Sequence, residues 1–210
     1  MKMSSAFIAD NIQDFVRNKL NTNNNGHDLQ HIERVLNNAK KIITSDANPK
    51  IVFTAIYLHD LIDYKVTNCI EQEIEDIKKI LFEENYSNNE IDEIIEIISS
   101  ISFSKHITLT TINQKIVSDA DKLDALGSMG IIRTIQYGQS VGRPFYEEAN
   151  LLKTDDNISF NKSTLTSLSH FYDKLLKLPD LMYTKKGKEL ALERIKIINL
   201  FLESFYNELK

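Results

Sequence analysis

The chain has 210 residues, of which 42% are hydrophobic and 26% are charged, a composition typical of globular proteins. Its formal net charge of −5 gives no basic footprint for a nucleic-acid polymer, and the single cysteine, Cys69, excludes an intrachain disulfide and a multi-cysteine zinc site. The sequence has neither an apolar stretch of about 18 residues nor a basic-then-apolar N-terminus, so we expect a cytoplasmic protein without a membrane partner.

The first part of the chain places apolar residues at helical spacing. The first predicted helix runs from about Phe7 to Leu20 and ends at the polar tract 21–26, whose Asn and Gly residues favour a turn. A second helix continues to about Ser45. Pro49 stands where a third helix would begin, because proline is favoured in the first helical turn.

Two later helix starts carry capping patterns. Asn68 and Glu71 have the spacing of a capping box, and Ser87 and Glu90 repeat that spacing before an isoleucine-rich stretch. We therefore predict that helices begin at both places.

The C-terminal part continues the helical pattern. Apolar residues spread over a wide helix face there, so we predict that helices within 163–208 complete the core. Few segments alternate apolar and polar residues as a half-buried strand does, and no repeat or clear linker divides the chain. The sequence predicts an all-α fold with one domain over residues 1–210.

The adjacent pair His59-Asp60 carries the most chemical information. It follows the apolar run 51–58 directly, and more apolar residues come after it. Burying an isolated carboxylate there costs several kcal/mol. A divalent cation removes that penalty, because neutral imidazole and ionised carboxylate are the ligands that such ions accept. With His31 before the pair and Asp121 after it, the sequence predicts a buried metal site.

The last ligand comes from a stretch with three carboxylates, Asp119, Asp121 and Asp124. An EF-hand is excluded, because Leu123 and Gly130 occupy positions of the calcium loop that need oxygen ligands. Helical spacing puts Asp121 and Asp124 on a face beside the apolar stripe. From spacing alone, either carboxylate completes a His/His/Asp/Asp set.

Another histidine precedes the set. His27 and His31 are four residues apart, so a helix would stack them on one face, where both could approach a single ion. The residue after His27 is Asp28, whereas the helix of a zinc protease needs glutamate there. The pattern does not support a metalloprotease.

Together the motifs resemble those of the HD-domain metal-dependent phosphohydrolases. The similarity is strongest to the small stand-alone bacterial branch that includes YedJ-like and YpgQ-like proteins. The matching segments are 27–35, 58–60, 119–125 and 170–178. The resemblance implies an HD-type helical bundle, with its metal motifs within 27–126 and one metal between its core helices. The metal ligands that it implies are His31, His59, Asp60 and Asp121.

Such a ligand set fits phosphate chemistry. A divalent ion held by two imidazoles and two carboxylates keeps open positions, lowers the pKa of a bound water and neutralises charge on phosphoryl oxygens. The two carboxylates favour Mn or Mg, with Fe, Co, Ni or Zn as alternatives. Asp63, one turn beyond Asp60, is our candidate for orienting or deprotonating the attacking water, and a helix-end cap is the alternative role.

Four further residues are candidates for substrate binding. Lys65 and Lys122 lie beside ligand residues and could hold phosphate as point charges, or be surface lysines. Arg34 fits a phosphate contact or an intraprotein ion pair. His27 could donate to a phosphate or leaving oxygen, or support His31.

The resemblance implies hydrolysis of phosphate esters or anhydrides, commonly those of nucleotides. In this branch, nucleoside triphosphates cut to monophosphate and pyrophosphate by metal-activated water are the expected reaction. Two alternatives stay open: a phosphomonoester or cyclic-nucleotide hydrolase, and a non-catalytic sensor domain that binds a metal or a nucleotide. The expected partner is a phosphorylated small molecule, and the sequence is compatible with a homodimer.

Overall fold

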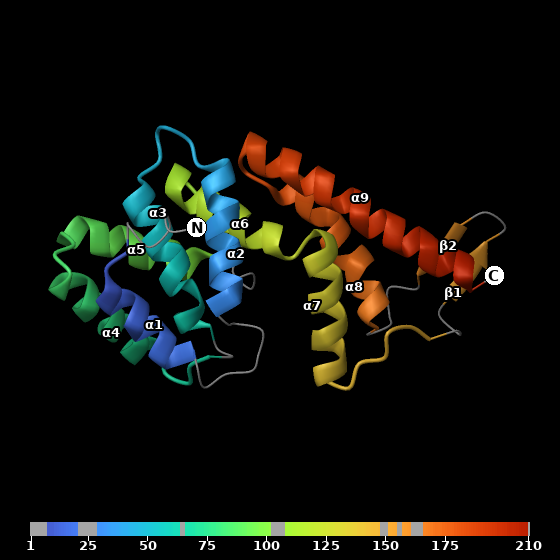
Figure 1. The fold of residues 1–210 in the computed structure, drawn as a ribbon, viewed down its shortest axis with the longest axis horizontal. Coiled ribbons are helices and arrows are strands. Elements are labelled where there is room, and N and C mark those ends of the chain that lie inside the picture. The colour runs from blue at the N-terminus through green and yellow to red at the C-terminus, as the bar shows by residue number, and fades with distance from the viewer. Residues whose placement is uncertain are drawn as a thin grey trace. The chain divides into compact units, whose positions relative to one another are not determined.

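The computed structural model describes residues 8–20, 29–63, 66–101, 108–147, 151–154, 157–160 and 166–209 (Figure 1). Helices dominate this part of the chain, which confirms the predicted all-α class. The chain consists of two compact units, Met1–Asp121 and Lys122–Lys210. One domain over residues 1–210 stays a prediction.

The first unit is made of helices. They are α1 (Asp10–Leu20), α2 (Leu29–Ile42), α3 (Pro49–Leu58), the 3-10 helix η2 (His59–Ile62), α4 (Ile70–Glu83), α5 (Asn88–Ser100) and most of α6 (Ile112–Asp124). Several predicted bounds are confirmed, since α1 ends at Leu20 and α3 begins at Pro49. The side chain of Asn48 caps α3 by accepting from two backbone N–H groups of the first turn. α2 ends earlier than predicted, at Ile42 rather than near Ser45.

α3 lies at the centre of this unit. Its buried residues include Ile51, Val52, Phe53, Thr54, Ala55, Ile56 and Leu58. It contacts α1, α2, α5 and η2. A helix that is apolar around most of its circumference has to be enclosed by its neighbours. The residues directly after it, His59 and Asp60, therefore enter the interior rather than the surface.

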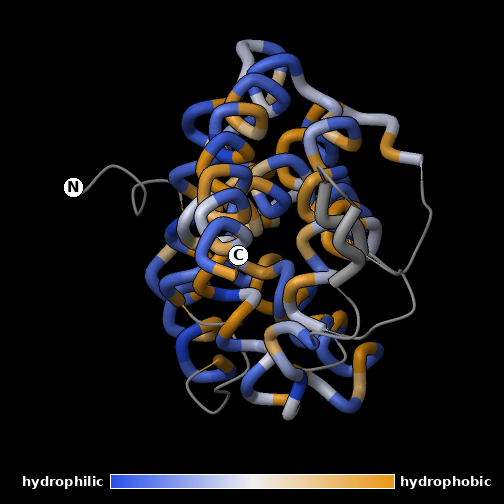
Figure 2. The backbone as a smooth tube through the Cα atoms, turned by 90° about the vertical axis from the view of Figure 1, so that its right-hand side faces the viewer, coloured by the Kyte–Doolittle hydropathy of each residue, from blue (hydrophilic) through white to orange (hydrophobic). Residues whose placement is uncertain are grey.

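The surrounding helices are amphipathic. Orange apolar residues recur between blue polar ones along the helical tubes of Figure 2. In α2, for example, Ile32, Val35 and Ala39 are completely buried, whereas Glu33 and Asn37 are exposed. This spacing turns one face of each helix toward the core.

The two predicted capping boxes have different outcomes. The box at Asn68 and Glu71 is wrong, because α4 begins at Ile70 and its N-cap is Cys69, which makes no side-chain capping bond. The box at the start of α5 is confirmed. Ser87 N donates to Glu90 Oε2 over 2.8 Å, and Glu90 N donates back to the serine hydroxyl.

The second unit begins at the last turn of α6. It contains α7 (Gly127–Ser140), the strands β1 (Leu151–Thr154) and β2 (Asn157–Phe160), α8 (Ser167–Asp173), the 3-10 helix η4 (Leu175–Leu181) and α9 (Lys185–Glu208). α9 contacts α7 and η4, and α8 contacts the same two elements. α7 and α8 meet at Gly138, where a Cβ atom would lie 1.9 Å from Ser167 Oγ, so a larger residue would have to displace that hydroxyl.

The sequence did not predict the hairpin formed by β1 and β2. β1 and β2 pair antiparallel, with Leu151 opposite Phe160 and Thr154 opposite Asn157. Each strand has four residues, a length at which alternation is a weak signal. No helix in the described part of the chain is long and apolar enough to cross a membrane.

The capping box of α5 predicts a pH dependence of stability. Hydrogen bonds from Lys50 and from Ser87 lower the pKa of Glu90 from 4.5 to about 2. Because the folded-state pKa is depressed, this stabilisation is complete above the unfolded-state pKa and is lost as the pH falls toward about 2. We expect the free energy of unfolding, measured by urea denaturation, to fall more between about pH 5 and pH 3 in the wild type than in Glu90→Gln. Equal losses in the two proteins would contradict this role of Glu90.

Candidate metal centre

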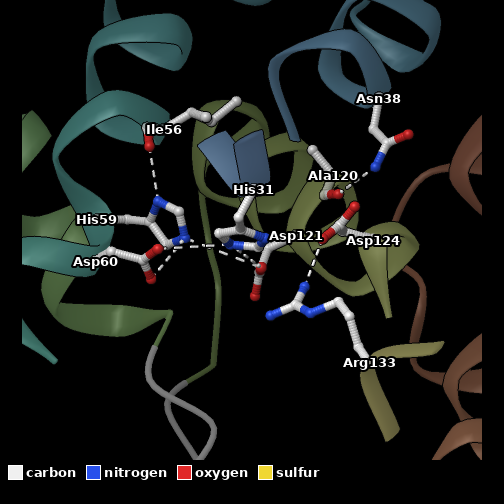
Figure 3. A network of polar contacts seen from close by, with 9 residues as sticks. All are labelled: His31, Asn38, Ile56, His59, Asp60, Ala120, Asp121, Asp124 and Arg133. Atoms are coloured by element: carbon white, nitrogen blue, oxygen red, sulfur yellow. Dashed lines mark hydrogen bonds and ion pairs between the residues drawn. The ribbon is translucent and has the colours of Figure 1, made fainter. Parts of the chain in front are cut away.

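Four predicted ligands converge from three elements of the first unit (Figure 3). His31 comes from α2, His59 and Asp60 form the start of η2, and Asp121 lies near the end of α6. His31 Nε2 lies 3.4 Å from Asp121 Oδ1, and His59 Nε2 lies 3.9 Å from the same oxygen. His31, His59 and Asp121 each offer one ligand atom, and these atoms all lie within 4.8 Å of one another.

Asp60 lies against both imidazoles. Its Oδ1 atom is 3.2 Å from His59 Nε2, and its Oδ2 atom is 3.6 Å from His31 Nε2. The side chains of His31, His59 and Asp60 are only 3–6% exposed, whereas that of Asp121 is 19% exposed. The cluster is therefore enclosed by protein but is not sealed at Asp121.

The end of α3 sets the orientation of His59. The last carbonyls of a helix lack an intrahelical partner, and that of Ile56 accepts a hydrogen bond from His59 Nδ1 over 2.7 Å. A carbonyl can only accept, so Nδ1 carries a proton, and in the neutral ring Nε2 therefore keeps its lone pair. That Nε2 atom is buried and makes no hydrogen bond. A buried nitrogen with a free lone pair, aimed at two carboxylates, is what a metal ligand requires.

The electrostatics agree with this role. Burial alone raises the pKa of Asp121, but the hydrogen bond from His31 and the charges of His59 and His31 outweigh burial and lower that pKa below its ordinary value. The nearby charge of Asp60 opposes them. A carboxyl group with a lowered pKa is ionised at neutral pH, as metal binding demands. A divalent ion would replace any proton on the Nε2 atoms of the two imidazoles, and a set of two imidazoles and two carboxylates fits a borderline or hard divalent ion.

The other two carboxylates of α6 lie elsewhere. Asp119 is completely buried and Asp124 is 2% exposed. Asp124 forms an ion pair with Arg133 of α7 (Figure 3). Arg194 of α9 donates to the carbonyl of Leu123 beside it. The geometry thus brings Asp121, and not Asp124, to His31 and His59.

Asp63 follows η2 directly. Its backbone N–H donates to the carbonyl of Asp60, and its own carbonyl accepts from Val66 and Thr67. The backbone of Asp63 thus ends η2, as in the alternative role considered from the sequence. Its half-buried side chain lies three residues beyond the predicted ligand Asp60, so its part in the chemistry stays a prediction.

The substrate-binding candidates have different surroundings. Lys122 is 8% exposed, its Nζ atom donates to the Leu181 carbonyl over 2.9 Å, and the same atom lies 4.5 Å from the centroid of the Tyr183 ring. Arg34 is half-buried on α2, one turn beyond His31. His27 and Lys65 lie outside the described residues.

Sequence reasoning missed two groups beside the ligands. One is the carbonyl of Ile56, which no side-chain pattern reveals. The other is Asn38, a buried amide that donates to the carbonyl of Ala120, next to Asp121. The available signal was a polar residue on the apolar face of α2, seven positions after His31.

Comparison with known proteins identifies the family. The HD domain family matches residues 28–126, which include all four predicted ligands. The Bacillus subtilis protein YpgQ is 30% identical over 206 residues, which are 96% of this chain and 93% of YpgQ. The chain belongs to the HD-domain family.

Solved structures agree with this assignment. The crystal structure of YpgQ in complex with ADP has a TM-score of 0.74 at 29% identity, covering 95% of this chain and 96% of that one. An HD-superfamily hydrolase from Bacillus thuringiensis has a TM-score of 0.75 at 33% identity, covering 95% of each chain. The resemblance to YpgQ-like HD proteins is thereby confirmed, and the predicted ligands fall inside the segment that matches the HD domain.

The convergence of ligands predicts metal-dependent stability. Adding Mn²⁺ to metal-stripped protein should raise the melting temperature of the wild type and leave His59→Ala unchanged, because a ligand that binds only the folded state stabilises it. At 100 times the Kd, one bound ion contributes about 2.7 kcal/mol. The matched control is His170→Ala, since His170 lies on α8 in the second unit. Differential scanning calorimetry measures both, and equal shifts in His59→Ala and the wild type would contradict the site.

Proposed function

We propose that this HD-domain protein is a metal-dependent phosphohydrolase that cleaves nucleoside triphosphates to monophosphate and pyrophosphate. The observation that carries the proposal is the convergence of His31, His59 and Asp121 around one point, with Asp60 against both imidazoles. Two relatives support it: the Bacillus thuringiensis protein is an HD-superfamily hydrolase, and YpgQ was crystallised with ADP.

The four ligands would hold one divalent ion, for which we propose Mn or Mg because two of the four ligands are carboxylates. Such an ion, when bound, lowers the pKa of a coordinated water and neutralises charge on phosphoryl oxygens. The residues of the chain contribute the rest. His59 presents Nε2 because its Nδ1–H donates a hydrogen bond to the Ile56 carbonyl, and Asp121 supplies a carboxyl group whose pKa lies below its ordinary value.

Asp63 is the proposed base. A carboxylate just after η2 would accept a proton as a water oxygen attacks the α-phosphorus, and the bond from that phosphorus to the oxygen bridging the α- and β-phosphates would break. Pyrophosphate leaves with the bridging oxygen, and the attacking oxygen stays in the monophosphate. This assignment makes the position of the water oxygen in the products a direct test.

We propose that the four candidates named from the sequence supply positive charge to the phosphates. They are His27, Arg34, Lys65 and Lys122. Arg34 lies on the same helix as a ligand, one turn beyond His31. Lys122 would have to exchange its hydrogen bond with the Leu181 carbonyl for a phosphate oxygen. Only Arg34 and Lys122 of these four lie within the described residues. A guanidinium can bind two phosphate oxygens at once and an ammonium group acts as a point charge, so Arg34 is the better candidate of the two.

Product analysis tests the reaction. We expect metal-stripped wild type to convert nucleoside triphosphates to monophosphate and pyrophosphate only after Mn²⁺ or Mg²⁺ is added. In ¹⁸O-water the label should enter the monophosphate, because attack is at the α-phosphorus. His59→Ala should show no turnover and His170→Ala full turnover, as measured by chromatography and mass spectrometry.

Other results of the product analysis would favour one of the alternative functions. Labelled inorganic phosphate and free nucleoside from a nucleoside monophosphate, with no turnover of triphosphates, would point to phosphomonoester hydrolysis, and turnover of cyclic nucleotides alone would point to a diesterase. Metal or nucleotide binding without any turnover would favour a sensor domain. Each of these would contradict the proposed reaction.

The role of Asp63 has its own test. Asp63→Asn should lower kcat by about 10²- to 10⁴-fold, because an amide cannot accept the proton of the attacking water. The affinity for Mn²⁺ should stay unchanged, since Asp63 is not a proposed ligand. Asp92→Asn, on the exposed side of α5, is the control. Steady-state kinetics with calorimetric metal titration separates the two effects, and an unchanged kcat in Asp63→Asn would exclude Asp63 as the base.

A further inference from the structure

We infer that Asn38 is a positioning residue, which holds the two helices that carry His31 and Asp121 at the spacing that the metal needs. The inference rests on the metal site proposed above. It concerns a side chain that is not itself a proposed ligand and that lies in the described part of the first unit.

The first observation is a buried hydrogen bond. Asn38 lies on α2 and is 3% exposed, and its Nδ2 atom donates to the carbonyl of Ala120 on α6 over 3.0 Å (Figure 3). The two residues are 82 positions apart in the chain. Ala120 is bonded directly to Asp121, so the bond ends one residue from a proposed ligand.

The second observation is the position of Asn38 on its helix. His31 and Asn38 are seven residues apart, which is close to two helical turns, so both lie on the same face of α2. From that face, His31 Nε2 approaches Asp121 Oδ1 at 3.4 Å. α2 and α6 therefore meet through two neighbouring polar contacts, one made by ligands and one made by Asn38.

The surroundings of Asn38 explain why a polar residue matters there. Val35, Ala39 and Ile42, on the same helix, are 0–1% exposed. Apolar contacts are non-directional, so the burial of these residues does not by itself fix the rotation or the height of α2. A hydrogen bond has a preferred length and angle and constrains both the rotation and the height. Burying an amide brings little net stability, so its value at this point is the geometry that it imposes.

The consequence concerns the metal rather than the fold. Groups that orient ligands without touching the ion typically change metal affinity by about 10- to 100-fold when they are removed. Replacing Asn38 by leucine keeps the size of the side chain but removes the donor. The ligands His31 and Asp121 would then keep their chemistry and lose their fixed spacing.

The experiment compares four proteins: wild type, Asn38→Leu, Asn37→Ala and Thr54→Val. Asn37 is the exposed neighbour of Asn38 with the same side chain. Thr54→Val removes a different buried hydrogen bond of the first unit, the 2.7 Å contact with the Tyr86 hydroxyl. Isothermal titration of metal-stripped protein with MnCl₂ gives the Kd, and urea denaturation without metal gives the stability.

We expect the Kd of Asn38→Leu to rise by about tenfold or more and that of the two controls to stay at the wild-type value. A wild-type Kd in Asn38→Leu, or an equal rise in Thr54→Val, would overturn the inference. If Asn38→Leu does not fold, Asn38→Ser replaces it, because the shorter hydroxyl does not reach the Ala120 carbonyl; the same rise is expected. A wild type that binds no Mn²⁺ would instead overturn the proposed function, and the role of Asn38 with it.

Discussion

The interior position of the His59-Asp60 pair is the constraint on which the site depends. α3 is apolar on nearly all sides, so α1, α2 and α5 enclose it, and its end lies inside the unit. The Asp60 carboxylate is 4% exposed there, and a buried charge has to be compensated. The same packing that encloses α3 brings α2 alongside it. His31 of α2 lies 3.6 Å from the Asp60 carboxylate, whereas Asp121 of α6 adds a second negative charge beside it, and the compensating positive charge is what we propose a divalent ion to supply.

The change from α3 to η2 determines how His59 is oriented. Where the α-helix ends, the Ile56 carbonyl becomes available and accepts a hydrogen bond from Nδ1–H of His59. The other ring nitrogen, Nε2, is buried and keeps its lone pair when the ring is neutral. The backbone of Asp63 then ends η2 by donating to the Asp60 carbonyl. The end of α3 at Leu58 thus determines both which nitrogen of His59 carries the proton and how the ring is oriented.

The sequence revealed those parts of the molecule that local signals determine. His59 and Asp60 stand out because a charged pair inside an apolar run is anomalous wherever the chain folds, and Ser87 with Glu90 determines its helix start locally. The box at Asn68 failed because α4 begins one position later than that box requires, with Cys69 as its N-cap. The Asn38 to Ala120 bond joins residues 82 apart, and Asp124 is drawn to Arg133 by tertiary packing. Such pairings depend on how helices rotate against each other, which periodicity does not specify.

Anomalous diffraction at the manganese absorption edge, from crystals of the wild-type protein grown with Mn²⁺, tests the central claim most directly. The account predicts one peak about 2.0–2.3 Å from Nε2 of His31, Nε2 of His59 and a carboxylate oxygen of Asp60 and of Asp121. A peak bound by other residues, or a cluster that excludes the ion at saturating Mn²⁺, would contradict it.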